Sequence, residues 1–143
     1  MIAHRDDGYE IATDPDRLDI DLIHHWLSTD AFWALGRSRE TVERSVRASL
    51  NFGLYDVDGA QAAYARVVTD LSTFAWLCDV YVAPAHRGNG LGTWLATAIR
   101  DHLAPYELKR VLLSTLDAHE VYAKAGFVPF PRPENLMILG PGE

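Results

Sequence analysis

Three glycines at every second position are the clearest chemical signal in this sequence. They lie in residues 87–92, which read Arg-Gly-Asn-Gly-Leu-Gly. An apolar, β-branched run over 74–82 precedes them, and Pro84 ends that run because proline cannot donate to a sheet ladder. Apolar residues then recur at helical spacing until Pro105. Glycine lacks the β-carbon that would hold a phosphate away from backbone N–H groups, and a helix N-terminus adds unpaired donors and partial positive charge. The pattern therefore predicts a cradle for a phosphorylated ligand.

The spacing of these glycines indicates which kind of phosphate-binding motif the sequence contains. A dinucleotide site needs G-x-G-x-x-G and an acidic residue after a following strand, and a P-loop needs a lysine after its last glycine. The sequence has G-x-G-x-G and neither of those residues. It resembles instead the pyrophosphate-binding motif of the GNAT acyltransferase superfamily, R/Q-x-x-G-x-G/A, with Arg87, Gly90 and Gly92 at the defining positions. The V-x-V-x-P pattern at 80–84 matches the family's fourth strand as well.

A second motif lies downstream, in residues 118–127, which read AHEVYAKAGF. It is similar to the family's A-x-x-L-Y-x-x-x-G-F signature, with Val121 in place of the leucine. The family often has an asparagine seven residues before the tyrosine, and that position is Thr115 here. The residues that match the signature outright are Ala118, Tyr122, Gly126 and Phe127. With its flanking strands the resemblance covers roughly 52–139, most of the chain.

The resemblance implies a fold and a cofactor. The sheet is expected to be mixed, with its fourth and fifth strands splayed, so that the pantetheine arm of acetyl-CoA pairs with the exposed edge of the fourth strand. A backbone N–H near Tyr81 would then polarise the thioester carbonyl. The expected cofactor contacts are Val80, Tyr81, Val82, Arg87, Gly88, Asn89, Gly90, Leu91, Gly92, Thr93 and Thr115.

Acyl transfer to an amine needs a neutral amine, a donor for the oxyanion and a proton for the leaving thiolate. The resemblance assigns the last role to Tyr122 as general acid; the alternative is a tyrosine that only packs its helix on the sheet. Asp79 interrupts an apolar strand, where a carboxylate is costly unless paired or hydrated, so it is a candidate general base. The alternative is a structural ion pair with Arg66 or Arg87. His119 competes for the base role because its ordinary pKa suits proton transfer; the alternative is an exposed histidine at the start of its helix.

Two helices are expected ahead of the sheet's central strands, one capped by Asp19 and one by Ser38. In the GNAT resemblance, these helices and their connection cover the acceptor side of the cleft. Within the connection, Phe32 and Trp33 could attract an ammonium group and Arg37 could bind an acceptor carboxylate. The alternative is a core tryptophan and a surface cation.

Composition excludes several other functions. The 143 residues carry 13 basic and 20 acidic side chains, a formal net charge of −7, and no basic run, which argues against nucleic acid and anionic membranes as partners. The single cysteine, Cys78, allows no internal disulfide, lacks a histidine-assisted nucleophile pattern and is expected to pack in its strand. His24 and His25 are adjacent without other ligand spacing, so no metal site is expected. A charged N-terminus and the absence of a long apolar run make the cytoplasm the expected location.

The chain reads as a single GNAT-like domain over 1–143. The order of elements predicts an α/β (α+β) fold, a mixed, mostly antiparallel twisted sheet of about six or seven strands with about four helices. Asp58-Gly59 predicts a tight hairpin turn, Asp117 a cap for the tyrosine helix, and Gly126 its C-terminal end. The strands are expected at 9–13, 52–57, 61–69, 74–82, 110–115, 127–130 and 136–139.

These observations predict an acetyl-CoA-dependent N-acetyltransferase that transfers acetyl to a primary amine by direct attack in a ternary complex. The alternative is a non-catalytic acyl-CoA-binding sensor of the same fold. The acceptor, a small molecule or a peptide amine, is not specified by these residues, and a longer acyl chain and a homodimer both stay open. The acidic balance mildly favours a cationic acceptor.

Overall fold

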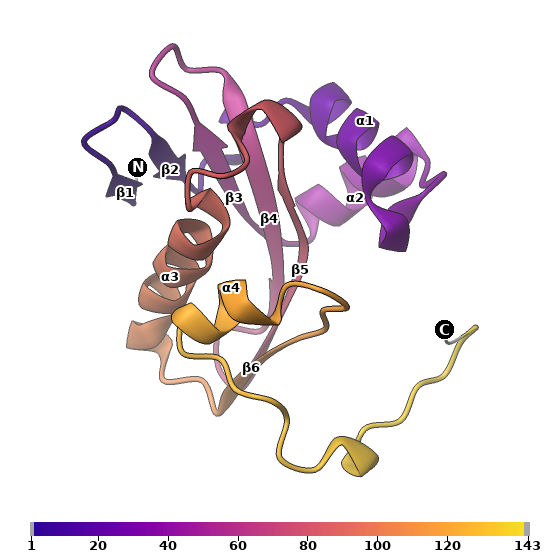
Figure 1. Cartoon of the computed structure of the whole chain (residues 1–143). Helices are drawn as coiled ribbons and strands as arrows, with labels where there is room; N and C mark the ends of the chain where they lie inside the picture. Colours follow the sequence, from indigo (N-terminus) through magenta and orange to yellow (C-terminus); the bar gives the residue numbers. More distant parts are fainter. Residues whose placement is uncertain (1, 142–143) are drawn as a thin grey trace.

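One six-stranded sheet runs through the molecule in the order β1-β2-β3-β4-β5-β6 (Figure 1). The structure is a computed structural model, and it describes residues 2–141. Neighbouring strands are antiparallel except for β5 and β6, which are parallel. The sheet is therefore mixed and mostly antiparallel, as the sequence predicts. Its strands are β1 (Ala3–His4), β2 (Glu10–Ala12), β3 (Leu50–Tyr55), β4 (Gln61–Thr69), β5 (Phe74–Val82) and β6 (Arg110–Leu113).

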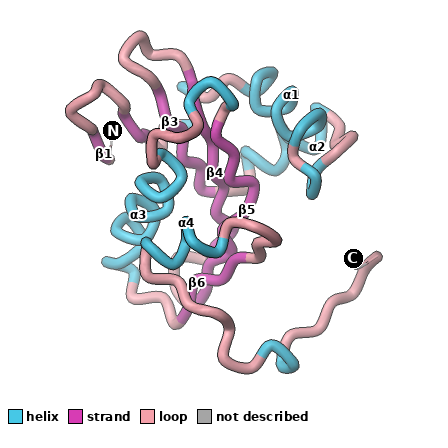
Figure 2. The backbone as a smooth tube through the Cα atoms, in the orientation of Figure 1, coloured by secondary structure: helices cyan, strands magenta, loops and turns pink. Residues whose placement is uncertain are grey.

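Four α-helices flank this sheet, and two of them begin where the sequence places a cap. The Asp19 carboxylate accepts the Leu22 N–H at the start of α1, and the Ser38 hydroxyl accepts the Thr41 N–H at the start of α2. Figure 2 shows α1 and α2 together on one side of the sheet and α3 on the other. The helices are α1 (Ile20–Asp30), α2 (Arg39–Arg47), α3 (Leu91–Leu103) and α4 (His119–Lys124).

Each face of the sheet has its own core. Alternation along β4 sends Ala63 and Ala65 to the side of α3, where they pack with Leu95 and Ile99. Tyr64 points the other way and packs with the α1 and α2 residues. The two cores therefore hold α1 and α2 on one face of the sheet and α3 on the other.

The strand β5 changes direction halfway along its length. It pairs with β6 only over its first four residues, from Phe74 to Leu77. Its register against β4 then shifts, because Asp79 takes a left-handed conformation (φ 52°) and forms a bulge. Beyond the bulge, β5 and β6 diverge (Figure 1), and the β6-facing edge of β5 up to Val82 has no strand partner within residues 2–141. β5 and β6 thus correspond to the splayed fourth and fifth strands that the family resemblance implies.

Two strands expected near the end of the chain are absent. Residues 127–130 and 136–139 are irregular, and a short 3₁₀ turn (Pro133–Asn135) separates them. Pro129, Pro131 and Pro133 remove backbone donors from this segment, which weakens any strand pairing there. The two strands expected at this end are therefore wrong, and the short β1, which the sequence did not reveal, brings the sheet to six strands, within the six or seven expected.

Two local expectations are also wrong in detail. The β3–β4 connection contains Asp58 and Gly59 but is five residues long, and Asp56 stabilises it by accepting the N–H groups of Asp58 and Ala60. It is a wider turn than the two-residue one predicted, with Gly59 still at positive φ. Asp117 does not cap α4: Ala118 takes the cap position, and its N–H donates to the Thr115 hydroxyl. Gly126 ends α4 in the left-handed conformation, as expected.

Candidate active site

The glycine loop joins the end of β5 to the start of α3, where the sequence places it. A 3₁₀ turn (Pro84–His86) leads in, and both Gly88 (φ 86°) and Gly90 (φ 72°) are left-handed, a conformation that favours glycine. A β-carbon built on either glycine meets no atom within 4 Å, so both face open space. The space in front of the loop is therefore kept clear of side chains.

The first turn of α3 offers its backbone donors to that space. Gly90 is the cap residue, and no side chain of the described residues caps the helix. The first bond of the helix runs from the Trp94 N–H to the Gly90 carbonyl. The N–H groups of Leu91, Gly92 and Thr93 therefore precede the hydrogen-bonded ladder and, with the helix dipole, form an anion site.

Arg87 is held at the side of this loop by three contacts. Its Nε donates to the Val82 carbonyl at 2.9 Å, and its Nη2 donates to Asp30 at 3.2 Å. Its guanidinium also lies 5.3 Å from the centre of the Tyr81 ring. Tyr81 donates its hydroxyl to the same Asp30 carboxylate at 2.6 Å, and its ring stacks on Trp26. The cation that the motif requires is thus positioned before any ligand binds.

Asp30 was not identified from the sequence, although a signal for it exists. A carboxylate in the last turn of a helix opposes the negative end of the helix dipole, so it needs a cation from elsewhere. The hydrogen bond from Tyr81 and then the Arg87 cation hold the Asp30 pKa below its ordinary value. In turn, burial and the Asp30 hydrogen bond raise the Tyr81 pKa to about 12. Asp30 therefore stays charged, and it ties the end of α1 to the glycine loop.

The N-terminal hairpin supports the loop from the other side. Arg5 donates to the Asn89 carbonyl at 3.0 Å, and the Tyr9 hydroxyl bonds to His86 Nδ1 at 2.7 Å. These contacts cross 84 and 77 residues of sequence, and no local pattern in the sequence indicated them. The loop is consequently anchored at its first turn and again in its centre.

The unpaired edge of β5 begins beside this loop. Val80, Tyr81 and Val82 lie on that edge, beyond the four residues that pair with β6. The structure therefore brings together the predicted strand edge and the predicted glycine loop. Thr115 lies beyond β6, on the far side of the divergence, and its hydroxyl is engaged by the Ala118 N–H.

Asp79 lies at the bulge itself and is almost fully buried. Three donors surround its carboxylate: Trp33 Nε1 at 2.9 Å on one oxygen, and Arg37 Nη1 at 2.8 Å with Arg66 Nε at 2.9 Å on the other. Its side chain is 2% exposed. Both oxygens are thus engaged by partners from β4 and from the connection between α1 and α2.

This environment bears on the two interpretations of Asp79. Burial raises its pKa, but the opposing charges of Arg37 and Arg66 and the hydrogen bonds outweigh burial and leave the pKa lower than usual. A carboxylate with a low pKa and no free oxygen is a poor proton acceptor. The contacts match the ion-pair interpretation, with Arg66 and Arg37 as partners and not Arg87.

The acceptor residues expected from the sequence are drawn into the same network. Phe32 and Trp33 are about half exposed and meet edge to face, with ring centres 5.1 Å apart. Arg37 was expected to bind a carboxylate of the acceptor. In the structure it binds the Asp79 carboxylate of its own chain instead. Phe32 is the member of this group that the ion-pair network does not use.

Tyr122 lies on α4, where it packs partly buried against the α3 side of the sheet. Its ring meets Phe127 edge to face at 6.0 Å, and burial raises its pKa to about 12. The phenol is therefore protonated throughout the neutral range. His119 begins the same helix with an exposed side chain.

Other candidate chemistry is accounted for by local contacts. Burial raises the Cys78 pKa to about 11, so the thiol is protonated and unreactive at neutral pH. His24 bonds to the Arg37 carbonyl at 3.1 Å. Within residues 2–141 no three potential metal ligands cluster, and none of the helices described there could cross a bilayer.

Comparison with known proteins gives this arrangement a family. Residues 20–127 match the model of the acetyltransferase (GNAT) family. A candidate acetyltransferase of Gibberella zeae is 32% identical, and the match covers 81% of this chain and 76% of that protein. The crystal structure of a candidate GNAT-family acetyltransferase from Xanthomonas campestris pv. campestris is 44% identical, covers 92% of both chains and superposes with a TM-score of 0.86.

The fold is also that of an enzyme solved with its cofactor. N-acetylglutamate synthase from Neisseria gonorrhoeae, in complex with coenzyme A and N-acetyl-glutamate, has a TM-score of 0.67 at 20% identity, covering 85% of this chain and 28% of that one. The chain belongs to the GNAT acetyltransferase family.

The contacts of Asp79 predict a large and pH-dependent loss of stability on Asp79→Asn. Asparagine keeps the shape and tolerates the left-handed conformation, but it leaves Arg37 and Arg66 without a counter-charge. We expect the free energy of unfolding at pH 7 to fall by about 3 kcal/mol, the lower end for a broken buried pair, because both arginines retain some solvent. Urea unfolding measures this difference.

The dependence on pH follows from the lowered pKa. The Asp79 charge contributes stability above its unfolded pKa of about 3.8, and that contribution is lost as the pH falls through the folded value. The gap between wild type and Asp79→Asn should therefore shrink below pH 4. Asp21→Asn, which breaks an exposed ion pair with Arg39, is the control and should change little. Equal losses in the two variants would contradict the buried-pair account.

Proposed function

We propose that this protein is an acetyl-CoA-dependent N-acetyltransferase that transfers an acetyl group to a primary amine. The observation that carries the proposal is the pair of left-handed glycines opening α3 directly beside the unpaired edge of β5. The loop has donors and open space for a pyrophosphate, and the strand edge has free backbone groups for an amide-bearing arm. Acetyl-CoA carries both groups.

The residues fit that cofactor in separate roles. Arg87 and the N–H groups of Gly88, Gly90 and the first turn of α3 would hold the pyrophosphate. The edge of β5 at Val80–Val82 would hold the pantetheine arm, and a backbone N–H there would polarise the thioester carbonyl. We propose these contacts from the open space at the glycines and from the unpaired edge.

The reaction is a direct transfer. The neutral amine attacks the thioester carbonyl, the C–N bond forms and the C–S bond breaks, and the amine proton passes to solvent or to His119. No residue becomes acylated, in keeping with a Cys78 thiol whose pKa is raised to about 11. The carboxylate of Asp79, held by two arginines, acts here as a positioning group for the bulge of β5.

Tyr122 would stabilise the departing sulfur. Its pKa of about 12 lies well above that of an ordinary thiol, about 8.5, so complete proton transfer from the phenol to the thiolate would be uphill. A hydrogen bond donated to the developing thiolate avoids this cost. We therefore assign to Tyr122 a hydrogen bond donated to the developing thiolate, in place of the full proton transfer that the family resemblance implies.

The direct test is a thiol-release screen. Acetyl-CoA is supplied as donor, with polyamines, amino acids, aminoglycosides and lysine peptides as acceptors, and free CoA is followed over time. Acceptor-dependent release supports the transferase. Tight binding of acetyl-CoA without CoA release for any amine would contradict the transferase and favour a non-catalytic acyl-CoA-binding module.

Gly90→Val tests the cradle. The side chain would enter the open space before α3, so we expect CoA affinity to fall by about 10- to 100-fold, the value of one or two hydrogen bonds to a charged group. Gly59→Val is the matched control, since Gly59 is also left-handed and open but lies in the β3–β4 turn. Calorimetric titration with CoA should separate the two variants. Equal affinities would rule out a phosphate site at Gly90.

Tyr122→Phe tests the leaving-group role. Removal of the hydroxyl should lower kcat by about 10²- to 10³-fold while KM for acetyl-CoA moves little, because the hydrogen bond forms mainly in the transition state. Since the phenol stays protonated to about pH 12, the wild-type rate should show no basic limb from Tyr122 below pH 10. Tyr106→Phe, at an exposed tyrosine after α3, is the control. A lower Tm with normal kcat would make Tyr122 a packing residue.

A further inference from the structure

The end of the chain exposes an apolar segment that the sheet does not use. Residues 136–139 read Leu-Met-Ile-Leu, and these side chains are 54%, 97%, 77% and 103% exposed. Figure 1 shows this tail leaving the 3₁₀ turn Pro133–Asn135 and running away from β6. Four consecutive apolar side chains in water indicate a surface that another surface covers.

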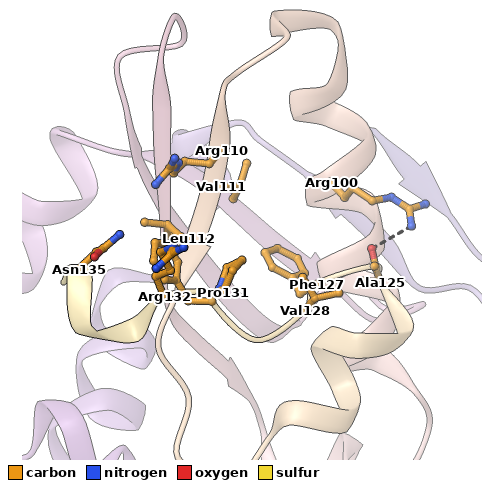
Figure 3. Close-up of a pocket in the computed structure, with 12 residues that line it drawn as sticks. Arg100, Arg110, Val111, Leu112, Ala125, Phe127, Val128, Pro131, Arg132 and Asn135 are labelled. Atoms are coloured by element: carbon orange, nitrogen blue, oxygen red, sulfur yellow. Dashed lines mark hydrogen bonds between the residues drawn. The ribbon is translucent and has the colours of Figure 1, made fainter.

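An apolar groove lies beside β6, close to where the tail departs. It has a volume of about 670 Å³, and one wall is β6 while the other is the segment after α4. Figure 3 shows Val111 and Leu112 on the strand side and Phe127 and Val128 on the other side. The groove is therefore bounded by two stretches of extended or irregular chain with aliphatic and aromatic side chains.

The backbone at this groove also lacks a partner. β6 is the last strand of the sheet, so within residues 2–141 its outer edge has no strand beside it. The facing wall, 127–130, has the composition of a strand but is irregular. One strand laid between them would pair with both. The tail 136–139 is four residues long, as β6 is, and it has the apolar composition that such a strand needs.

We propose that the groove receives the tail of a second copy of this chain, so that two copies exchange residues 136–139 reciprocally. Each tail would add a strand to the outer edge of the partner's β6 and bury its apolar side chains in the partner's groove. The two strands that the sequence predicts at 127–130 and 136–139 then form together, in the dimer and not in the isolated chain.

The course of the chain favours a second copy over the chain's own tail. Asn135 and Leu136 donate their N–H groups to the carbonyls of Arg132 and Pro133, and this turn sends the tail outward. Pro129, Pro131 and Pro133 stiffen the approach and oppose a reversal into the chain's own groove. Exchange leaves this path unchanged.

Charge favours a protein partner over a lipid surface. Residues 133–143 carry two acidic side chains and no basic one, and the formal net charge of the chain is −7. Both disfavour an anionic membrane as the surface that covers the tail.

Cysteine pairing tests the exchange in the full chain. On a Cys78→Ser background, Leu112→Cys is combined in turn with cysteine substitutions at each of the four tail positions, 136 to 139. Mild oxidation should give a covalent dimer for at least one pair, and mixing tagged and untagged copies should give the mixed dimer. Leu112→Cys with Val57→Cys is the collision control, since Val57 is equally exposed but lies in the β3–β4 turn.

Each result of that experiment decides the proposal. A covalent dimer above the collision control supports exchange. An internal disulfide in a monomer means that the tail closes on its own chain, and no disulfide means that the tail does not reach the groove, so either result overturns the proposal.

Sedimentation tests the same proposal without cysteines. The wild type should sediment as a dimer at about 50 μM, and charges in the apolar tail should raise the dimer Kd by about 100-fold or more. The two double variants, Leu136→Asp with Ile138→Asp and Met137→Asp with Leu139→Asp, cover the two sides of the strand. Val57→Asp is the control. A monomeric wild type, a dimer that survives both variants, or wild-type binding to anionic vesicles that the variants lose would overturn the exchange.

Discussion

A buried carboxylate on left-handed backbone is the constraint on which the site depends. Asp79 takes a conformation (φ 52°) that few side chains other than asparagine and aspartate tolerate, and its charge is removed from water. Three donors, Trp33, Arg37 and Arg66, compensate both costs. They come from β4 and from the connection between α1 and α2, so the bulge can form only when these elements are in place. The bulge bends β5 away from β6 and leaves the strand edge free.

The glycine loop depends on a second, smaller network at the end of the same strand. Asp30 at the end of α1 binds Arg87 and Tyr81, and the N-terminal hairpin holds the loop through Asn89 and His86. The helices on one face of the sheet therefore position both halves of the proposed cofactor site, the free edge and the phosphate cradle. A change in the α1–α2 region would affect the proposed cofactor site through either network, since Arg37 and Asp30 both connect that region to β5.

The parts of the fold that local sequence determines were predictable. The bounds of β4 and β5, the caps Asp19 and Ser38 and the glycine loop all follow from patterns within a few residues. The sequence also suggested Arg66 as a partner of Asp79, which the structure confirms. The pairs Arg37–Asp79 and Asp30–Arg87 were harder to predict, because charges 42 and 57 residues apart meet only after folding. The sequence marked Asp79 as unusual but left its role open. The strands predicted at 127–130 and 136–139 are absent for a related reason. The composition of a segment does not specify whether a partner strand is available to it.

Backbone amide NMR during titration with CoA tests the central claim most directly. The account predicts that shift changes concentrate in the glycine loop, the first turn of α3 and Val80–Val82, because the first N–H groups of α3 precede its hydrogen-bonded ladder and the edge of β5 beyond Leu77 has no strand partner within the described residues. Residues of the exposed β3–β4 turn should be unaffected. Shift changes concentrated in the groove beside β6, or no change at saturating CoA, would contradict the account.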